Sequence, residues 1–424
     1  MVKNLNTILL MLLLPGLLSA QELTRLELQQ AYDLAKKNYP MVKQKDLIKR
    51  TAEISIDNLQ KGFLPQVNLS GQASYQSEVT EVLVKVPGFT SEPLSKDQYK
   101  LVADLNQLIY DGGATKEQKV LQELNASVED QRVEVELYKL KERINQVFLG
   151  ILFLDEQLKQ VELVKADIQT GIKRVEAQVQ NGLAFKSGLS MLKAELLKAD
   201  QRAIETGSSK KGYIDALALF LGQPLSENIQ LVKPDMIAVS VTDEIVRPEV
   251  KLYNEQSKLI DHQDRLITSK NLPKASLFAQ GGYGRPALNM LQNEFDFYYL
   301  GGVRFNWSMG GLYTKKRERE QVEVNKKIVD IQKETFLLNT NTQLTQEYSE
   351  IDKLRKLIAS DKEIIELRKS VTDAAKAQLE SGVITASDYL EEVNAEDQAR
   401  QALITHQLQL LQAQINYQTI SGKQ

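Results

Sequence analysis

The sequence predicts a mainly α-helical protein with a small β component, built from two structural repeats. No proline occurs between Pro93 and Pro224 or after Pro286. Because proline breaks helix interiors, both stretches can hold very long helices. Each half also contains two short segments in which apolar and polar side chains alternate with the period of a β-strand. Matching features recur about 200 residues apart in the same order, which indicates an internal repeat.

The composition argues against an enzyme. The 424 residues include 53 Lys+Arg and 56 Asp+Glu, a net charge of -3, which gives no basic surplus for binding nucleic acid. Cysteine is absent, and this excludes disulfides, thiolate metal sites and cysteine catalysis. With only two histidines, His262 and His406, a histidine-rich metal site is excluded and a Ser-His-Asp hydrolase is disfavoured. We therefore expect no catalytic residues, no metal and no cofactor.

Residues 1–20 have the pattern of a secretory signal peptide. Lys3 provides a short positive region, residues 8–14 are an apolar run, and Ser19-Ala20 places small residues before a cut ahead of Gln21. The alternative is a membrane anchor, but the apolar run is short for a span of about 20 residues. We expect the mature chain to leave the cytoplasm and to contain no transmembrane helix.

Residues 21–222 are expected to form the first repeat. The double glycine Gly112-Gly113 and the pair Asn181-Gly182 bound a proline-free tract with apolar residues at steps of three and four, as in a coiled coil. Such a helix is about 100 Å long, far beyond an ordinary globular helix. The expected elements are a first helix, strands over 64–78 and 99–110, a long helix over 113–181 and a return helix over 187–221.

The second half repeats this order. Leu64-Pro65 before the first strand matches Leu272-Pro273 at an offset of 208, and Gly112-Gly113 matches Gly310-Gly311 at 198. A connector over 223–247, which contains Pro224, joins the halves. The second repeat is expected over 248–420, with a first helix, strands over 272–284 and 295–309, a long helix over 311–381 and a return helix over 387–420. Residues 421–424 are a tail.

The four strand segments suit an outer membrane. Alternating runs of about ten residues with aromatic side chains near their ends are typical of membrane-spanning strands, and Tyr75, Tyr283 and Trp307 are the candidate interfacial anchors. The alternative is a small soluble β-layer. Four strands cannot close a membrane barrel, and open edges are not viable in lipid. Spanning strands would therefore require several chains, and three chains would supply twelve.

Taken together, these features resemble the TolC family of outer-membrane efflux proteins. The likeness covers the mature chain. It rests on the Leu-Pro pair before the first strand of each half and on residues 105–113 and 305–311, which end the second strand of each half with a double glycine. It also rests on Gly182 with Ser187, and Gly382 with Ser387, near the helix ends. The resemblance implies a homotrimer whose long helices form an α-barrel continuous with a shared 12-stranded transmembrane β-barrel. It also implies a Gram-negative outer membrane location with a long periplasmic extension.

The function implied by the resemblance is a passive duct of a tripartite efflux or secretion system. Its partners would be a periplasmic membrane-fusion adaptor, an inner-membrane pump driven by protons or ATP, and outer-membrane lipid, with no nucleic acid. The alternative function is a periplasmic coiled-coil adaptor or envelope stalk without transport activity, which predicts a water-soluble protein.

Asp388 and Glu391 are the candidate periplasmic gate. A spacing of three places both carboxylates on one helix face, and by resemblance they occupy the family's acidic constriction, where a trimer would form rings that favour cations. The alternative reading is a helix cap, with Asp388 as the N-cap and Glu391 completing a capping box. Both roles can coexist.

The two helix-hairpin tips are the candidate surfaces for docking an adaptor, again by resemblance. The alternative for their glycines is ordinary helix C-capping. Ile384 and Gly188 depart from the family's closure network, so we expect closure to rest on apolar packing by Leu183, Val383 and Ile384. The docking candidates are Asn181, Gly182, Leu183, Ser187, Ser381, Gly382, Val383 and Ser387.

Overall fold

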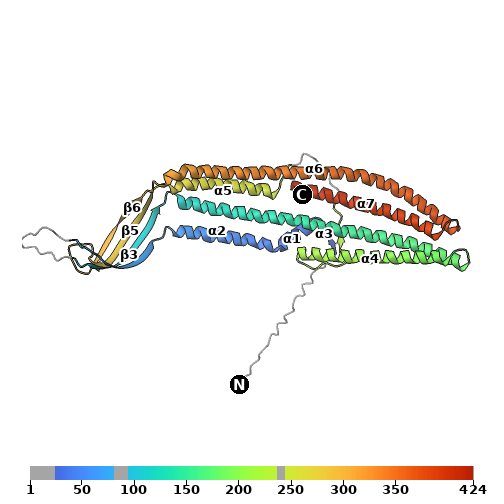
Figure 1. The fold of residues 1–424 in the computed structure, drawn as a ribbon, viewed down its shortest axis with the longest axis horizontal. Coiled ribbons are helices and arrows are strands. Elements are labelled where there is room, and N and C mark those ends of the chain that lie inside the picture. Colours follow the sequence, from blue (N-terminus) through green and yellow to red (C-terminus); the bar gives the residue numbers. More distant parts are fainter. Residues whose placement is uncertain (1–23, 81–93, 236–243, 424) are drawn as a thin grey trace, which may run out of the picture. The chain divides into compact units, whose positions relative to one another are not determined.

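The computed structural model describes residues 24–80, 94–235 and 244–423 (Figure 1). The signal peptide and part of the connector lie outside these residues. The chain divides into two compact units, which are described separately. Unit 1 comprises Met1–Tyr39, Lys141–Ala238 and Glu350–Ile415, and unit 2 comprises Pro40–Leu140, Val239–Ser349 and Asn416–Gln424.

Helices account for most of the described residues, and two of them are very long. In chain order the helices are α1 (Leu28–Asn38), a 3-10 turn η1 (Pro40–Val42), α2 (Lys43–Lys61), α3 (Ala114–Gln180), α4 (Lys186–Leu221), α5 (Pro248–Lys270), α6 (Gly311–Glu380) and α7 (Ala386–Ser421). The strands are β1 (Arg25–Leu26), β2 (Gln66–Tyr75), β3 (Asp97–Tyr110), β4 (Gln230–Leu231), β5 (Lys274–Arg285) and β6 (Asp296–Asn306). Helix α7 continues one residue into the expected tail.

Unit 2 contains a four-stranded antiparallel sheet in the order β2-β3-β5-β6. The hairpins of the two repeats are joined side by side through β3 and β5. The register places Leu101 opposite Tyr283, and Tyr283 opposite Phe297. Since side chains alternate along a strand, residues in register share a face. Most of the apolar residues of the four strands therefore lie on one side of the sheet, whereas Val102, Phe278 and Leu300 lie on the other.

The apolar face of the sheet is uncovered in the single chain. Tyr75 is 78% exposed, Phe297 79% and Tyr299 88%. Contiguous exposed apolar surface of this kind marks an interaction site with protein or membrane. Aromatic rings gather at the sheet end away from the helices, where the ring of Tyr283 lies 4.6 Å from that of Phe297.

The double glycines have a steric explanation at the junction of sheet and helices. Gly112 has φ +75°, and a Cβ there would lie 2.6 Å from both Leu272 Cβ and Ser269 O. In the second half a Cβ on Gly311 would collide with the side chain of Asn271. Gly112 is thus required by its positive φ and by the close approach of the α5 backbone, whereas Gly311 makes room for the Asn271 side chain. The Trp307 indole N–H donates to Asn271 O at 3.1 Å and ties the end of β6 to α5.

Unit 1 has an apolar core that includes a buried polar cluster around Asp397. The core near the helix ends includes Ile168, Leu192 and Tyr389, all almost fully buried. Farther along, the Asp397 carboxylate accepts hydrogen bonds from Gln160 at 3.0 Å and from Arg202 at 2.8 Å. Because a buried charge is costly unless it is paired, these contacts fix α3, α4 and α7 relative to one another. Within the described part of the chain, no helix is apolar over a stretch long enough to cross a membrane.

Candidate functional site at the hairpin tips

The two hairpin tips have the same helix C-terminus. In the first tip Gly182 has φ +73°, its N–H donates to Val179 O at 3.1 Å, and the Leu183 N–H donates to Gln178 O at 2.8 Å. This is a Schellman motif, in which glycine accepts the left-handed conformation and satisfies the last helical carbonyls. The same pair of bonds surrounds Gly382. The glycines therefore act as caps, as the alternative interpretation expected.

The polar residues beside these glycines also bond to the helix that they end. The Asn181 side-chain amide donates to Ala177 O at 2.9 Å, and the Ser381 hydroxyl donates to Ala377 O at 3.0 Å. Ser187 and Ser387 are exposed at the second position of the return helices. None of these four side chains is buried, so they stay available to a partner.

The capping box at the start of α7 differs from the one expected from the sequence. Thr385 is the N-cap, and Asp388 is the third helical residue. The Asp388 carboxylate accepts from the Thr385 N–H at 2.9 Å and the Thr385 hydroxyl at 2.8 Å, while the Asp388 N–H donates to the Thr385 hydroxyl at 3.3 Å. The expected box with Asp388 as N-cap and Glu391 as its partner is wrong, because α7 begins three residues earlier.

This capping box lowers the pKa of Asp388 from its usual 3.8, chiefly through the Thr385 backbone N–H and then through its hydroxyl. The lower folded-state pKa stabilises the cap above the unfolded value of 3.8, and this contribution disappears as the pH falls through the folded pKa. Asp388 is thus ionised at neutral pH. Glu391 is exposed and makes no hydrogen bond or ion pair with any described residue.

The first tip lacks this cap. Phe185 stands at the N-cap of α4 without a side-chain hydrogen bond, and Gly188 stands where the second tip has Asp388. The lack of a side chain at Gly188 allows α4 and α7 to approach closely, since a Cβ there would lie 3.2 Å from the Ala386 Cβ. The position in the first tip that corresponds to Asp388 therefore carries no acidic side chain. It lies instead in a close contact between α4 and α7.

The two tips are joined within one chain. The Gln178 side-chain amide donates to Leu379 O at 2.8 Å, and Arg174 forms an ion pair with Glu380. These contacts connect the end of α3 to the end of α6. Because they involve both helix ends, we expect the tips of one chain to move together.

Tyr389 is buried between the helices that form the two tips. It is 1% exposed, and its ring lies so close to α3 that a Cβ on Gly171 would approach it to 3.0 Å. Its hydroxyl donates to Asp167 O at 3.4 Å. Burial raises the pKa of Tyr389 to about 12, so the hydroxyl stays a donor at any physiological pH.

Three apolar side chains project from the tips. Phe185 is 87% exposed, Leu183 79% and Val383 72%. Ile384, in contrast, packs against the core that contains Tyr389. Of the three residues expected to pack for closure, only Ile384 is packed within the chain. Sequence reasoning missed Phe185 and Thr385, although the Thr-x-x-Asp spacing of a capping box was readable at 385–388.

The expected membrane anchors lie at both ends of the sheet. Tyr75 and Tyr283 are in the part of β2 and β5 away from the helices, and Trp307 follows β6 next to α6. Among the described residues no three His, Asp or Glu side chains gather in a way that could hold a metal ion.

Comparison with known proteins gives one family and one fold. Residues 31–223 match the model of the outer membrane efflux protein family. No curated protein sequence matches the chain.

Three solved structures illustrate the shared fold. The outer membrane protein VceC of Vibrio cholerae has 14% identity and a TM-score of 0.66 over 93% of this chain and 96% of its own. The CmeC outer membrane channel of Campylobacter jejuni has 15% identity and a TM-score of 0.64 over 93% and 85%. The open MtrE outer membrane channel of Neisseria gonorrhoeae has 13% identity and a TM-score of 0.67 over 93% and 89%.

The family match covers the first repeat, and the structural likeness extends over both repeats. The two-repeat fold, the four-stranded sheet and the paired hairpin tips are thus those of outer-membrane efflux channels. Residues 31–223 are thus similar to the outer membrane efflux protein family, and the chain shares its fold with outer-membrane efflux channels of known structure.

Proposed function

We propose that this efflux channel is the outer-membrane duct of a tripartite efflux or secretion system, working as a homotrimer. The observation that carries the proposal is the uncovered apolar face of the sheet, flanked by the open edges of β2 and β6. Lipid would cover that face, and pairing of edges between copies would satisfy the open backbone groups. Three copies bring twelve strands together, an even number within the known range.

An exposed stripe on α6 supports association of copies. Val324, Ile328, Ile331 and Leu338 recur at steps of four, three and seven, and all are exposed in unit 2. We call these four residues the α6 seam. At 100° per residue the seam lies on the side of α6 opposite Arg319 and Lys326, which pair with α5. Its spacing is that of a helix–helix interface.

The tips are the proposed docking surface for a periplasmic adaptor. The apolar side chains of Leu183, Phe185 and Val383 are large and exposed, which is unfavourable unless a partner covers them. Since the chain has no nucleotide-binding motif, energy would come from an inner-membrane pump. The exported compound would be selected by that pump, while the duct conducts passively.

Glu391, with Asp388, is the proposed periplasmic gate. Asp388 is ionised but its carboxylate is held by Thr385, whereas the carboxylate of Glu391 is free to coordinate a cation on the axis. Three copies would concentrate negative charge around the axis and bind divalent cations.

Capping and gating can be separated by substitution. We expect Glu391→Gln to raise the Mg²⁺ concentration that blocks planar-bilayer conductance by roughly tenfold, without changing tip stability. Thr385→Ala should leave this block unchanged but destabilise the start of α7 by about 1 kcal/mol, measured as faster amide exchange at 386–389. Ser387→Ala is the matched control for Thr385→Ala. Unchanged block in Glu391→Gln and in Asp388→Ala with Glu391→Ala would reject the gate.

A further inference from the structure

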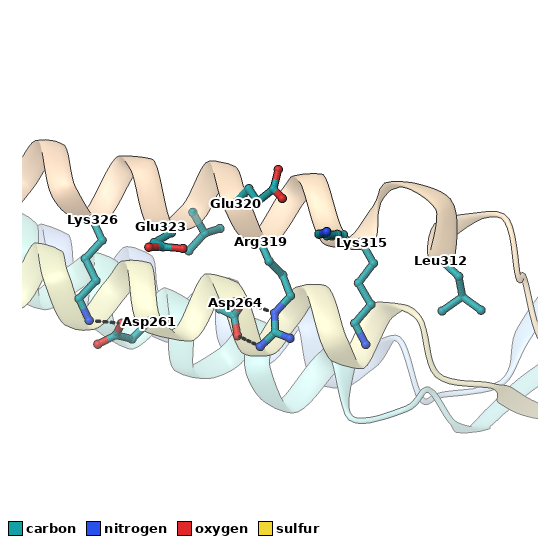
Figure 2. Close-up of a pocket in the computed structure, with 10 residues that line it drawn as sticks. Asp261, Asp264, Leu312, Lys315, Arg319, Glu320, Glu323 and Lys326 are labelled. Carbon is teal, nitrogen blue, oxygen red and sulfur yellow. Dashed lines mark hydrogen bonds and ion pairs between the residues drawn. The ribbon is translucent and has the colours of Figure 1, made fainter.

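A groove between α5 and α6 begins where the sheet ends (Figure 2). It encloses about 670 Å³ and is lined on the α6 side by Lys315, Lys316 and Arg319. Leu312 lies at the end of the groove next to the strands. The groove belongs entirely to unit 2, and its far end is occupied by the ion pair of Lys326 with Asp261 at 2.6 Å.

The acidic residues that line the groove all have basic partners other than Lys315 and Lys316. Glu320 and Glu323 of α6 pair with Arg317 and Lys327 of the same helix. Both acidic residues of α5 in the groove already have basic partners. The Asp264 carboxylate accepts two hydrogen bonds from Arg319, at 2.7 and 2.8 Å. The Asp261 carboxylate accepts one from Lys326. Neither Lys315 nor Lys316 makes an ion pair with a described residue. Figure 2 shows the Lys315 side chain extending toward α5 beside Arg319. The guanidinium of Arg319 keeps its third nitrogen, Nη1, unused by Asp264.

The surroundings of this basic end are those of a membrane–water boundary. Trp307 and Met309 are about half exposed, and Tyr313 projects fully from the first turn of α6. Tryptophan and tyrosine collect at headgroup depth because one part of each ring is apolar and another part hydrogen-bonds. The corresponding positions of the first repeat, at the offset of the double glycines, are Glu117 and Gln118. In the first repeat an acidic and a neutral residue thus replace the two lysines, and the Glu117 carboxylate lies 3.2 Å from the His262 ring nitrogen. The basic groove end is therefore specific to α6.

We propose that the end of this groove formed by Lys315, Lys316 and Arg319 binds the headgroup of an anionic phospholipid in the inner leaflet of the outer membrane. The inference rests on the proposed function, which places the sheet in that membrane. The two ammonium groups and the free nitrogen of Arg319 donate to the phosphate oxygens, and Leu312 and Trp307 contact the acyl chains. A headgroup without its own ammonium, as in phosphatidylglycerol, is preferred over a zwitterionic one, because no cation competes for the phosphate.

Trp307 is the only tryptophan of the chain, and its contact with Asn271 places it at the end of α5 next to the sheet, so it can report lipid at this junction. The full chain is reconstituted in mixed vesicles of phosphatidylglycerol and phosphatidylethanolamine. In one set only the anionic lipid has brominated chains, and in the other set only the zwitterionic lipid has them. The ratio of tryptophan quenching gives the lipid preference at the junction. We expect a preference of about twenty-fivefold for the anionic lipid, since Lys315 and Lys316 near the surface each contribute about fivefold.

The test variant is Lys315→Gln with Lys316→Gln, which keeps side-chain length and helix propensity. It should reduce the preference to about onefold, because both fivefold contributions are lost. The matched control is Lys362→Gln with Lys369→Gln, which removes two exposed lysines of α6 that make no ion pair with a described residue. The control should behave as the unmodified chain.

The two proposals fail in different ways. Absence of quenching by either brominated lipid would mean that the junction is not in the membrane, which rejects the proposed function. Equal quenching by both lipids, unchanged in Lys315→Gln with Lys316→Gln, would leave the function standing and overturn the lipid site.

Discussion

Replacing Ile331 and Leu338 by glutamate is expected to convert the proposed trimer into single chains. Both residues belong to the α6 seam and are exposed in one chain, so the substitutions leave its own packing intact. In the trimer they would place charges in an apolar contact. Each lost apolar side chain removes about 1.5–3 kcal/mol of burial, and each buried unpaired carboxylate costs several kcal/mol more. Because every interface of the trimer carries the change, we expect no detectable trimer in native mass spectrometry of the detergent-solubilised protein.

The control for this variant is Asn325→Glu with Gln343→Glu. It adds the same two charges at exposed positions of α6 that lie about 100° around the helix from the centre of the seam. The control should remain trimeric. A seam variant that stays trimeric with unchanged thermal stability would show that copies do not meet along this stripe.

Charging the first tip should abolish export without affecting assembly. Leu183→Glu with Phe185→Glu replaces two side chains that are more than three-quarters exposed and contribute nothing to the core of unit 1. If both are buried under an adaptor, each is worth at least about 2 kcal/mol, or roughly thirtyfold in affinity. A host that carries this variant in place of the natural chain should be as sensitive to exported toxic compounds as one lacking the gene.

The matched control for the tip is Lys173→Glu with Gln180→Glu. It places glutamates at exposed positions in the last turns of α3, which come before the tip in the chain. The control should export normally, and both variants should assemble normally. Normal export by the Leu183→Glu, Phe185→Glu variant would exclude the first tip as a docking surface. The result would then direct attention to Val383 on the second tip.

Much of this fold could be predicted from the sequence because its signals are long and repeated. Absence of proline over more than a hundred residues permits long helices, and strict alternation in four segments predicts strands with one apolar face. The register of β3 with β5 could not be predicted from the sequence, because pairing between the two repeats depends on residues far apart in the chain. The sheet order therefore came from the structure.

The candidate site was predicted less well. A capping box depends on the first helical residue to within one position, and sequence boundaries are less certain than that. Asp388 was consequently predicted as the N-cap, three residues after the actual N-cap Thr385. Phe185 was missed for another reason, since an aromatic residue in an apolar stretch is usually part of a core. Only the structure reveals that it projects from the tip.

The charges of Lys315 and Lys316 illustrate a similar limit. As a sequence, residues 315–317 are a short basic run before a mixed helix. The structure adds that the acids facing this run from α5 are already paired with Arg319 and Lys326, which leaves the two lysines uncompensated. Charge pairing across helices thus decides which part of a charged helix can bind a partner.

The measurement that tests the central claim most directly is the mass of the particle solubilised in mild detergent from isolated outer membranes. A shared barrel requires about three chain masses in that fraction, after correction for bound detergent. A monomer or dimer recovered from the soluble periplasm would contradict the duct.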